Sequence, residues 1–310
     1  MSDAVDISVI IPAYNRQAVI GRALASVLAQ EAGGLEILVI DDGSTDATAA
    51  VAAGFPQVTV IRRANGGPAA ARNAGIRQAR GRWIAFLDSD DAWRPGKLRA
   101  QMALLSATPG AAFCATAHRT FTPDGRCAAR PAAMPVDAVD MQRQILDNIA
   151  VQTDSVIVAR DLLETLGGFD ERLHTAEDVE LFLRCAAATR PVFLEEVFVD
   201  VYLGDDGTVR RYGRIARAAC RREVFLRCGR HLVDRRLRHD RRRALAREAL
   251  ELARLHLADG ARAEAARWLI RSVGGGLDAD RLKVALECLL GTERYDRHSA
   301  RAKGVARLWR

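Results

Sequence analysis

The sequence lacks the features that would place it in a membrane, in the secretory pathway or among disulfide-bonded proteins. No apolar run approaches the roughly 18 residues needed to cross a bilayer. Residues 1–6 include acids instead of a basic leader, so no signal peptide is expected. Six cysteines are scattered without a CxxC pair or metal-ligand spacing, which predicts reduced thiols in a chain of 310 residues. We expect a cytoplasmic protein.

Two common nucleotide-binding patterns are also missing. No GxGxxG follows the first apolar run at 7–11, which argues against a dinucleotide-dependent oxidoreductase. The glycine-containing stretch at 65–75 fits neither that pattern nor a P-loop. The composition, 49% hydrophobic and 27% charged, is that of a globular protein with a buried core. One large domain or two modest ones are expected.

Short apolar runs alternate with helical segments over the first hundred residues. Strands separated by helices in this way are typical of a mostly parallel sheet with helices on both faces. In such a sheet, ligands bind beyond the carboxyl ends of the strands. The predicted strands are 7–11, 36–40, 58–61 and 83–87, and the predicted helices are 19–29, 45–53 with Ser44 as its cap, 69–80 and 95–106.

The alternation loosens after residue 111. Beyond about residue 210 the strand signal ends, and small-residue spacing predicts a helical hairpin at 244–257 and 262–273. We therefore expect an α/β domain at 1–204 and a basic α-helical region at 205–310. The other predicted elements are strands at 112–121, 154–158, 192–194 and 197–203, a loop at 122–135, and helices at 136–149, 177–188 and 282–290.

The charge of the chain divides between these two regions. Residues 1–204 carry a net charge of −6 and residues 205–310 a net charge of +13. Such a basic region favours an anionic partner. Its few aromatic residues are too spread to form a base-stacking surface, so we expect no nucleic acid.

An acidic cluster follows the predicted strand at 83–87. Asp88, Asp90 and Asp91 lie within four residues, and their mutual repulsion would be offset by a bound cation. Oxygen ligands at a strand end suit Mg²⁺ or Mn²⁺, which keep positions open for substrate phosphates. The alternative is a helix cap with solvated acids.

Three further sites each have a functional and a structural interpretation. Asp42 follows a buried strand and can accept hydrogen bonds from a ribose or a base, although it also fits a turn. Arg72 can reach a phosphate from a helix of small residues, which could equally serve close packing. Glu177 and Asp178 begin a predicted helix, where acids usually complement the helix dipole.

Taken together, these stretches resemble a known enzyme family. The sequences at 8–16, 39–46, 65–75, 86–91 and 167–170 with 177–181 occur in the order found in family 2 glycosyltransferases, which have the GT-A fold. The resemblance covers about residues 7–203. It implies an inverting glycosyltransferase that uses a UDP-sugar and Mn²⁺ or Mg²⁺.

The resemblance also implies roles for the residues of the donor site. Pro12, Ala13 and Tyr14 would lie along the uridine, with Tyr14 near the base, and Asp42 would bind the uracil edge. Arg72 would lie near the nucleotide.

On the catalytic side, the resemblance assigns roles to five carboxylates. Asp88 and Asp90 match the DxD pair at the ribose and the metal, and Asp91 matches a carboxylate that touches the cation. Asp178 matches the catalytic base, with Glu177 beside it supporting the acceptor pocket. Such a base takes the proton of the attacking acceptor hydroxyl.

Two departures from the family pattern bear on function. The QxxRW stretch of processive members is absent, which predicts the transfer of one sugar per encounter. Residues 202–207 stand where many members carry a basic or histidine-bearing stretch, and Arg210 or Arg211 could substitute for it.

Acceptors in this family are often lipid-linked or part of a cell-surface polymer. A saccharide or lipid-linked acceptor is therefore expected, together with weak contact between the basic region and an anionic inner membrane face. The alternative is that the arginines pair with nearby acids or face solvent.

Two other functions remain open. A nucleotidyltransferase shares the acidic metal chemistry, but its glycine- and Lys/Arg-rich loop is not seen at 12–16. A catalytically inactive nucleotide-sugar-binding module is the other, and the intact acids at Asp178 and 88–91 argue against it.

Overall fold

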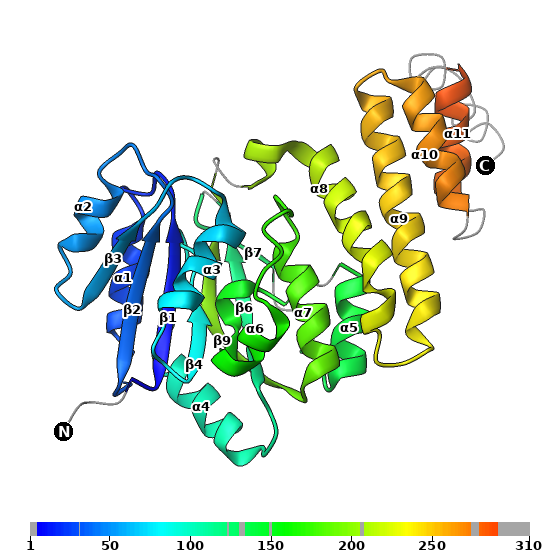
Figure 1. Ribbon diagram of the computed structural model, residues 1–310. Helices are drawn as coiled ribbons and strands as arrows, with labels where there is room; N and C mark the ends of the chain where they lie inside the picture. The colour runs from blue at the N-terminus through cyan, green and yellow to red at the C-terminus, as the bar shows by residue number, and fades with distance from the viewer. Residues whose placement is uncertain are drawn as a thin grey trace.

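The computed structural model describes residues 5–30, 32–122, 124–129, 134–148, 151–204, 208–273 and 279–290. Within these residues, a mixed nine-stranded sheet forms the centre, in the order β3-β2-β1-β4-β8-β6-β9-β5 with β7 paired to β6. The first strands lie at one end of the molecule and the last helices lie at the other (Figure 1).

The N-terminal part of the sheet has the predicted parallel arrangement. Its strands are almost fully buried except for the one at the edge, which explains their continuous apolar runs. They are β1 (Ile7–Ala13), β2 (Leu35–Asp41), β3 (Val58–Arg62) and β4 (Trp83–Phe86).

Helices flank this part of the sheet, as predicted. Helix α3 (Pro68–Gln78) packs closely on the sheet, because a Cβ added to its Gly75 would lie 2.4 Å from Cγ2 of Ile10 on β1. The small residues of this helix therefore bring its backbone close to the sheet. The other helices here are α1 (Ile20–Leu28), α2 (Thr48–Ala53) and α4 (Lys97–Ala107).

The start of α2 differs from the prediction. The helix begins at Thr48 with Ala47 at the cap position, and Ser44 does not cap it. The Ser44 hydroxyl instead accepts a hydrogen bond from the backbone N–H of Asn15 at 3.0 Å. Ser44 thus joins the loop after β2 to the loop after β1.

The rest of the sheet is mixed in direction. Strand β8 is antiparallel to β4 and β6, β9 is parallel to β6, and β5 is antiparallel to β9. Only the N-terminal part is uniformly parallel among the described strands. The bounds are β5 (Ala92–Trp93), β6 (Phe113–Phe121), β7 (Cys127–Ala129), β8 (Ile157–Ala159) and β9 (Pro191–Tyr202).

Three strand predictions need correction here. The two strands expected at 192–194 and 197–203 form one strand, β9, whose register against β6 shifts around the exposed Glu195 and Glu196. The strand expected at 154–158 begins only at Ile157, as β8. Asp154 and Ser155 belong instead to the 3₁₀ turn η1 (Thr153–Ser155). The expected loop at 122–135 contains the short strand β7.

Helices make up the remainder of the described chain. The hairpin of α9 and α10 is confirmed, although α9 begins at Leu237, seven positions before the expected start. The bounds are α5 (Ala138–Leu146), α6 (Arg160–Leu166), α7 (Glu177–Ala188), α8 (Thr208–Arg227), η2 (Cys228–His231), α9 (Leu237–Ala258), α10 (Arg262–Ser272) and α11 (Ala279–Leu290).

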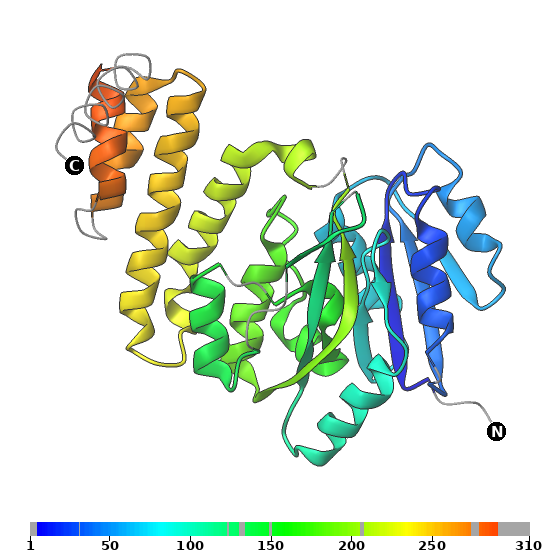
Figure 2. The same cartoon turned by 180° about the vertical axis from the view of Figure 1, so that it is seen from behind.

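The main hydrophobic core continues into the helical region. Val224 and Phe225 of α8 and Leu237 of α9 belong to the same buried cluster as Phe86 and Phe113 of the sheet. A smaller separate cluster joins α9, α10 and α11, which lie side by side at the far end (Figure 2). Among the described helices, none is long and apolar enough to span a bilayer.

Candidate active site

A cleft of about 830 Å³ lies between the ends of the N-terminal strands and the helices α3, α5, α7 and α8. The structure brings nearly all of the predicted site residues to this cleft, whereas Asp91 lies just behind it. Those that line it are Pro12, Ala13, Tyr14, Asp42, Arg72, Asp88, Asp90, Glu177 and Asp178.

Arg72 connects two sides of the cleft. Its Nη2 donates to Asp88 Oδ1 at 2.6 Å, and its Nη1 donates to Glu177 Oε1 at 2.8 Å. Burial disfavours its charge, but the two carboxylates raise the pKa of Arg72 above its usual value. Its buried Nε has no hydrogen-bond partner among the described residues. Arg72 therefore stays charged and holds both carboxylates in place.

The neighbouring Asn73 holds the turn that leads to α7. Its side-chain amide bonds the backbone N–H and C=O of Phe169, each at 2.9 Å. At Gly168, where φ is +69°, an added Cβ would lie 2.4 Å from Asn73 Oδ1. The Phe169 ring in turn lies beneath the Arg72 guanidinium, 5.5 Å from centroid to Cζ. The Gly167–Asp170 stretch thus positions Arg72.

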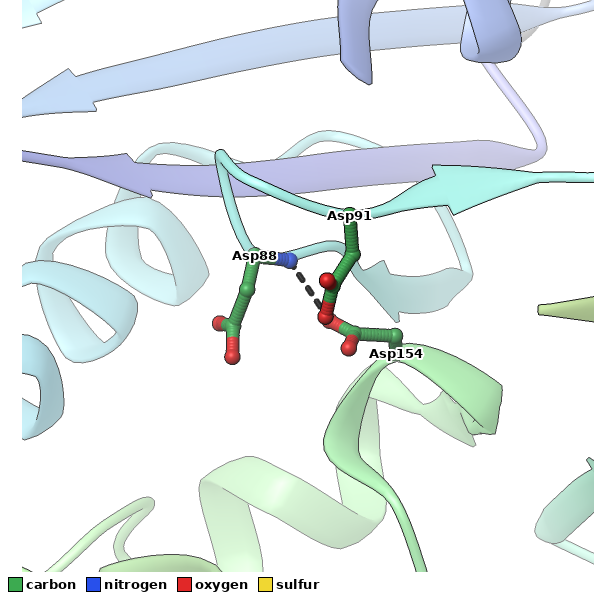
Figure 3. Close-up of side chains that lie close together, drawn as sticks. All are labelled: Asp88, Asp91 and Asp154. Carbon is green, nitrogen blue, oxygen red and sulfur yellow. Dashed lines mark hydrogen bonds between the residues drawn. The ribbon is translucent and has the colours of Figure 1, made fainter. Parts of the chain in front are cut away.

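Three carboxylates gather at the base of the cleft. Asp88 and Asp91 come from the loop after β4, and Asp154 comes from η1, with one oxygen of each within 4.8 Å of the others. The carboxyl groups of Asp91 and Asp154 point toward each other (Figure 3). Asp154 Oδ1 also accepts a hydrogen bond from the Asp88 backbone N–H at 2.5 Å.

The chemistry of this carboxylate cluster, Asp88, Asp91 and Asp154, fits a divalent cation. Burial, together with the charges of neighbouring acids, raises the pKa of Asp91 to about 11 and that of Asp154 to about 7. Protons or a cation must offset this repulsion. Closely spaced carboxylate oxygens are the ligands that Mg²⁺ and Mn²⁺ prefer.

The structure changes the predicted membership of this cluster. Asp154 was not recognised from the sequence, because nothing in its local pattern links it to the acids 66 positions earlier. Asp90 lines the cleft but lies outside the cluster. Its Oδ2 lies 3.9 Å from Arg16 Nε, and its carbonyl accepts a hydrogen bond from Arg22.

Asp42 organises a loop at the nucleotide end of the predicted site. Its carboxylate accepts hydrogen bonds from the backbone N–H groups of Gly66 and Gly67 and from Arg63 Nη1 at 2.7 Å. Asp42 is 3% exposed. Asp42 therefore orders the turn that begins α3 and has little unused acceptor capacity.

Glu177 and Asp178 differ sharply in environment. Glu177 is buried, and this burial raises its pKa against the opposing effect of Arg72. Asp178 is half-buried and accepts a hydrogen bond from Thr153 Oγ1 at 3.3 Å. Ala176 just before them has φ +64°, a left-handed conformation that is strained for a residue other than glycine. Of the two carboxylates, Asp178 is the more available to a ligand.

Two arginines of α8 form the far wall of the cleft. Arg217 and Arg221 line it from one turn apart, opposite the β1 end. Neither was predicted from the sequence, although their i,i+4 spacing places them on one face of a helix. The side chains of Arg210 and Arg211, which were expected to replace a basic stretch, lie outside the described residues.

Comparisons with known proteins show where similar chains occur. Succinoglycan biosynthesis protein ExoO of Rhizobium meliloti is 52% identical over 97 residues, covering 30% of this chain and 28% of ExoO. ExoW of the same organism is 34% identical over 210 residues, covering 61% of this chain and 66% of ExoW. The chain therefore spans less than two thirds of these relatives' length.

Solved structures show the same fold. A fragment of S. aureus TarS in complex with UDP-GlcNAc superimposes with a TM-score of 0.63 at 17% identity, covering 91% of each chain. The mannosyltransferase PcManGT of Pyrobaculum calidifontis, in complex with GDP-Man and Mn²⁺, gives 0.59 at 21% identity, covering 92% of this chain and 87% of that one.

The sequence profile of one family matches half of the chain. Residues 8–166 match Glycosyl transferase family 2, the stretch that contains β1 to α6 and most of the cleft residues. The order of motifs, the GT-A fold and the acid-lined cleft agree with this match. The chain is a member of glycosyl transferase family 2.

Proposed function

We propose that this protein is an inverting glycosyltransferase that transfers a sugar from a UDP-sugar to an acceptor hydroxyl. One arrangement carries the proposal: a single cleft contains Asp88 of the carboxylate cluster and, apart from it, the half-buried carboxylate of Asp178. A donor diphosphate and an acceptor hydroxyl need these two kinds of group on opposite sides of the reacting carbon.

The donor end of the cleft is formed by the end of β1 and the loop that follows it. Pro12, Ala13 and Tyr14 line it and would lie along the uridine. Asp42 supports this end through the turn at Gly66 and Gly67. Its proposed contact with the uracil edge requires exchange of the bond from Arg63, whose side chain is 26% exposed.

The carboxylate cluster would hold Mn²⁺ or Mg²⁺ through Asp88, Asp91 and Asp154. Such a cation would stabilise the charge that develops on the departing diphosphate. Arg72 keeps Asp88 oriented and would bring a positive charge near the nucleotide. Asp90 would contact the donor from the cleft wall and not the cation.

Asp178 would act as the general base. It would take the proton of the acceptor hydroxyl while the hydroxyl oxygen bonds to the anomeric carbon and the diphosphate leaves with the bonding electrons. Thr153 orients this carboxylate, and no described cation lies within ion-pair distance of it. Glu177 is held by Arg72, so its contribution would be to position α7 and the acceptor pocket.

The relatives support a role in polysaccharide or glycolipid synthesis. ExoO and ExoW are named for succinoglycan biosynthesis, and a hyaluronan synthase of Pasteurella multocida is 28% identical over 67% of this chain and 21% of its own. We propose a saccharide or lipid-linked acceptor and a cytoplasmic site of action, with contact at the inner membrane face.

A donor panel tests this function. Thermal unfolding should show stabilisation by UDP that is larger with Mn²⁺ or Mg²⁺ than with EDTA, because ligands stabilise the state that binds them. The matching UDP-sugar should then release UDP when an acceptor is added. Pyrophosphate release would indicate a nucleotidyltransferase, and binding without any release would indicate an inactive module.

A further inference from the structure

The far wall of the cleft carries two positive charges close to the proposed base. Arg217 and Arg221 both line the cleft, as do Glu177, Asp178 and Val179 at the start of α7. These arginines lie on α8, which packs against α7 and α9 (Figure 1). Pro12 to Tyr14 lie at the end of β1, and Asp42 follows β2. The arginines therefore belong to the acceptor side of Asp178.

Arg221 is anchored from behind. Its Nη2 and Nε lie 3.1 and 3.2 Å from Oε2 of Glu248, a residue of α9 that is 1% exposed. The other oxygen of Glu248 accepts a hydrogen bond from Asn148 at 2.9 Å. This pairing holds the Arg221 side chain in one position at the cleft surface.

Arg217 lacks such an anchor. Among the described residues, no carboxylate lies within ion-pair distance of its guanidinium, although it is half-buried. Burial lowers its pKa, the neighbouring Arg221 lowers it further, and Asp178 raises it. Arginine nevertheless remains charged in proteins, so a partly desolvated charge faces the cleft with only long-range compensation.

Two like charges beside a cleft are stabilised by an anion between them. A guanidinium presents several N–H donors in a plane, which suits the two or three oxygens of a carboxylate or phosphate. The diphosphate of the donor has another place in the proposed function, at the carboxylate cluster. The anion that meets α8 must therefore come from the other substrate.

We propose that Arg217 and Arg221 bind a phosphate or carboxylate of the acceptor, so that the enzyme glycosylates an acidic saccharide. This proposal rests on the proposed function, because Asp178 as the base defines which side of the cleft is the acceptor side. The anion would orient the acceptor so that its hydroxyl meets Asp178. Arg217 would supply the adaptable contact and Arg221 the fixed one.

Arg217→Gln is the informative variant, because among the described residues Arg217 has no ion pair to break. Loss of Arg221 would remove the closer of the two cations that face the buried Glu248 and leave it only Arg247, at 3.8 Å. Arg217→Lys keeps the charge without the planar fork. Arg214→Gln is the matched control: its side chain is 70% exposed, is also on α8, and is paired with Glu251 outside the cleft.

The probes are glucose 6-phosphate, glucuronate and neutral glucose, titrated by ligand-observed NMR. One arm uses protein saturated with UDP and Mn²⁺, and a second arm uses protein alone. Wild type should bind at least one acidic sugar more tightly than glucose in both arms. Because charged hydrogen bonds are lost, Arg217→Gln should weaken that binding about tenfold to a hundredfold. Comparison of the two acidic sugars tells phosphate from carboxylate.

In Arg217→Gln, the affinities for glucose and for UDP should stay at wild-type values. Arg214→Gln should bind the acidic sugars like wild type, and the affinity of Arg217→Lys for them should lie between those of wild type and Arg217→Gln. Equal binding of acidic and neutral sugars by wild type would overturn the proposal, as would equal losses in Arg217→Gln and Arg214→Gln. Failure of the proposed function has a different signature. UDP would then not bind to wild type, whatever the acidic sugars do.

Discussion

Arg72 Nη1 donates a hydrogen bond to Glu177 Oε1 at 2.8 Å, across 105 positions of sequence. The two side chains are 5% and 9% exposed, so the pair is buried. This contact joins α3, which follows the nucleotide side of the sheet, to the start of α7, which carries the proposed base.

Removal of either side chain of this buried pair should therefore destabilise the fold. Glu177→Ala should lower the free energy of unfolding by about 3–5 kcal/mol, because it leaves part of a buried charge uncompensated. Urea denaturation measures the loss. Glu177→Gln, which can still accept the hydrogen bond, should lose less. The exposed pair of Arg77 and Glu171, at 3.9 Å, provides the control, and Arg77→Ala should cost about 0–1 kcal/mol. Similar losses in both pairs would contradict the buried-pair interpretation.

The carboxylate cluster makes a prediction about which acids serve the cation. Asp91→Asn and Asp154→Asn should abolish most of the extra stabilisation that Mn²⁺ adds to UDP in thermal unfolding. Asp90→Asn should retain it, because Asp90 lies outside the cluster. If Asp90→Asn loses the Mn²⁺ effect while Asp154→Asn keeps it, the cation is held by the sequence-adjacent DxD pair.

The pH dependence of cation binding follows from the raised pKa values. Because burial raises the pKa of Asp154 to about 7, Mn²⁺ must displace a proton there at lower pH. Mn²⁺ affinity should therefore rise from about pH 6 to about pH 8, as measured by calorimetry. An affinity that does not change over this range would contradict protonation of the cluster.

In the cation-free protein, the contribution of Asp154 to the free energy of unfolding should fall as the pH rises. A folded-state pKa above the unfolded value of 3.8 stabilises the fold at low pH. That contribution is complete below about pH 4 and is lost as the pH rises through about 7. Mn²⁺ should restore the lost stability, and Asp154→Asn should remove both effects.

Asp178 should separate catalysis from donor binding. Asp178→Asn should lower the transfer rate by about 10²–10⁴-fold while UDP affinity stays near that of wild type, because a general base acts on the acceptor. Transfer assays on the donor found by the panel measure the rate. A loss below about tenfold would mean that another group takes the proton.

The membrane prediction can be made more specific with the structure. Several arginines of the helical region are paired, including Arg214, Arg254 and Arg267. Exposed arginines without a described pair gather at the start of α9, where each would contribute about 1 kcal/mol at an anionic surface. They are Arg235, Arg236, Arg238, Arg242 and Arg243.

Flotation of the full chain with anionic and neutral vesicles measures this contact. Binding should occur only with anionic vesicles, weaken as salt is raised, and fall when the exposed group is changed to glutamine. The same change at the three paired arginines should have little effect. Salt-insensitive binding, or none, would mean that the charge serves folding and solubility.

The N-terminal strands and the family could be predicted because their signals are local. Strands β1 and β2 are buried on both faces and read as apolar runs, and the polar residues that follow them begin the cleft. Asp154 could not be found in this way. It reaches Asp88 only because β8 pairs with β4 in the opposite direction, which sequence spacing does not encode.

The helical wall escaped prediction for a related reason. Helix α8 is interrupted at Gly213, where φ is +73°, and its arginine-rich sequence hides a short buried stripe at Ala218, Val224 and Phe225. What faces the cleft from this helix is decided by how that stripe packs on α7 and α9. The place of Arg217 at the cleft therefore depends on tertiary packing, which the local sequence does not reveal.

The shared core has a consequence for how the chain is made. Phe225, Leu237 and Ala244 belong to the hydrophobic core that contains Phe86 and Phe113. The strands of the sheet are therefore synthesised before all the residues of their core are available. Until α8 and the start of α9 have been synthesised, an apolar surface must stay exposed to the cell. We expect nascent chains that stop near residue 204 to engage chaperones or aggregate, and those that extend past residue 244 to be released.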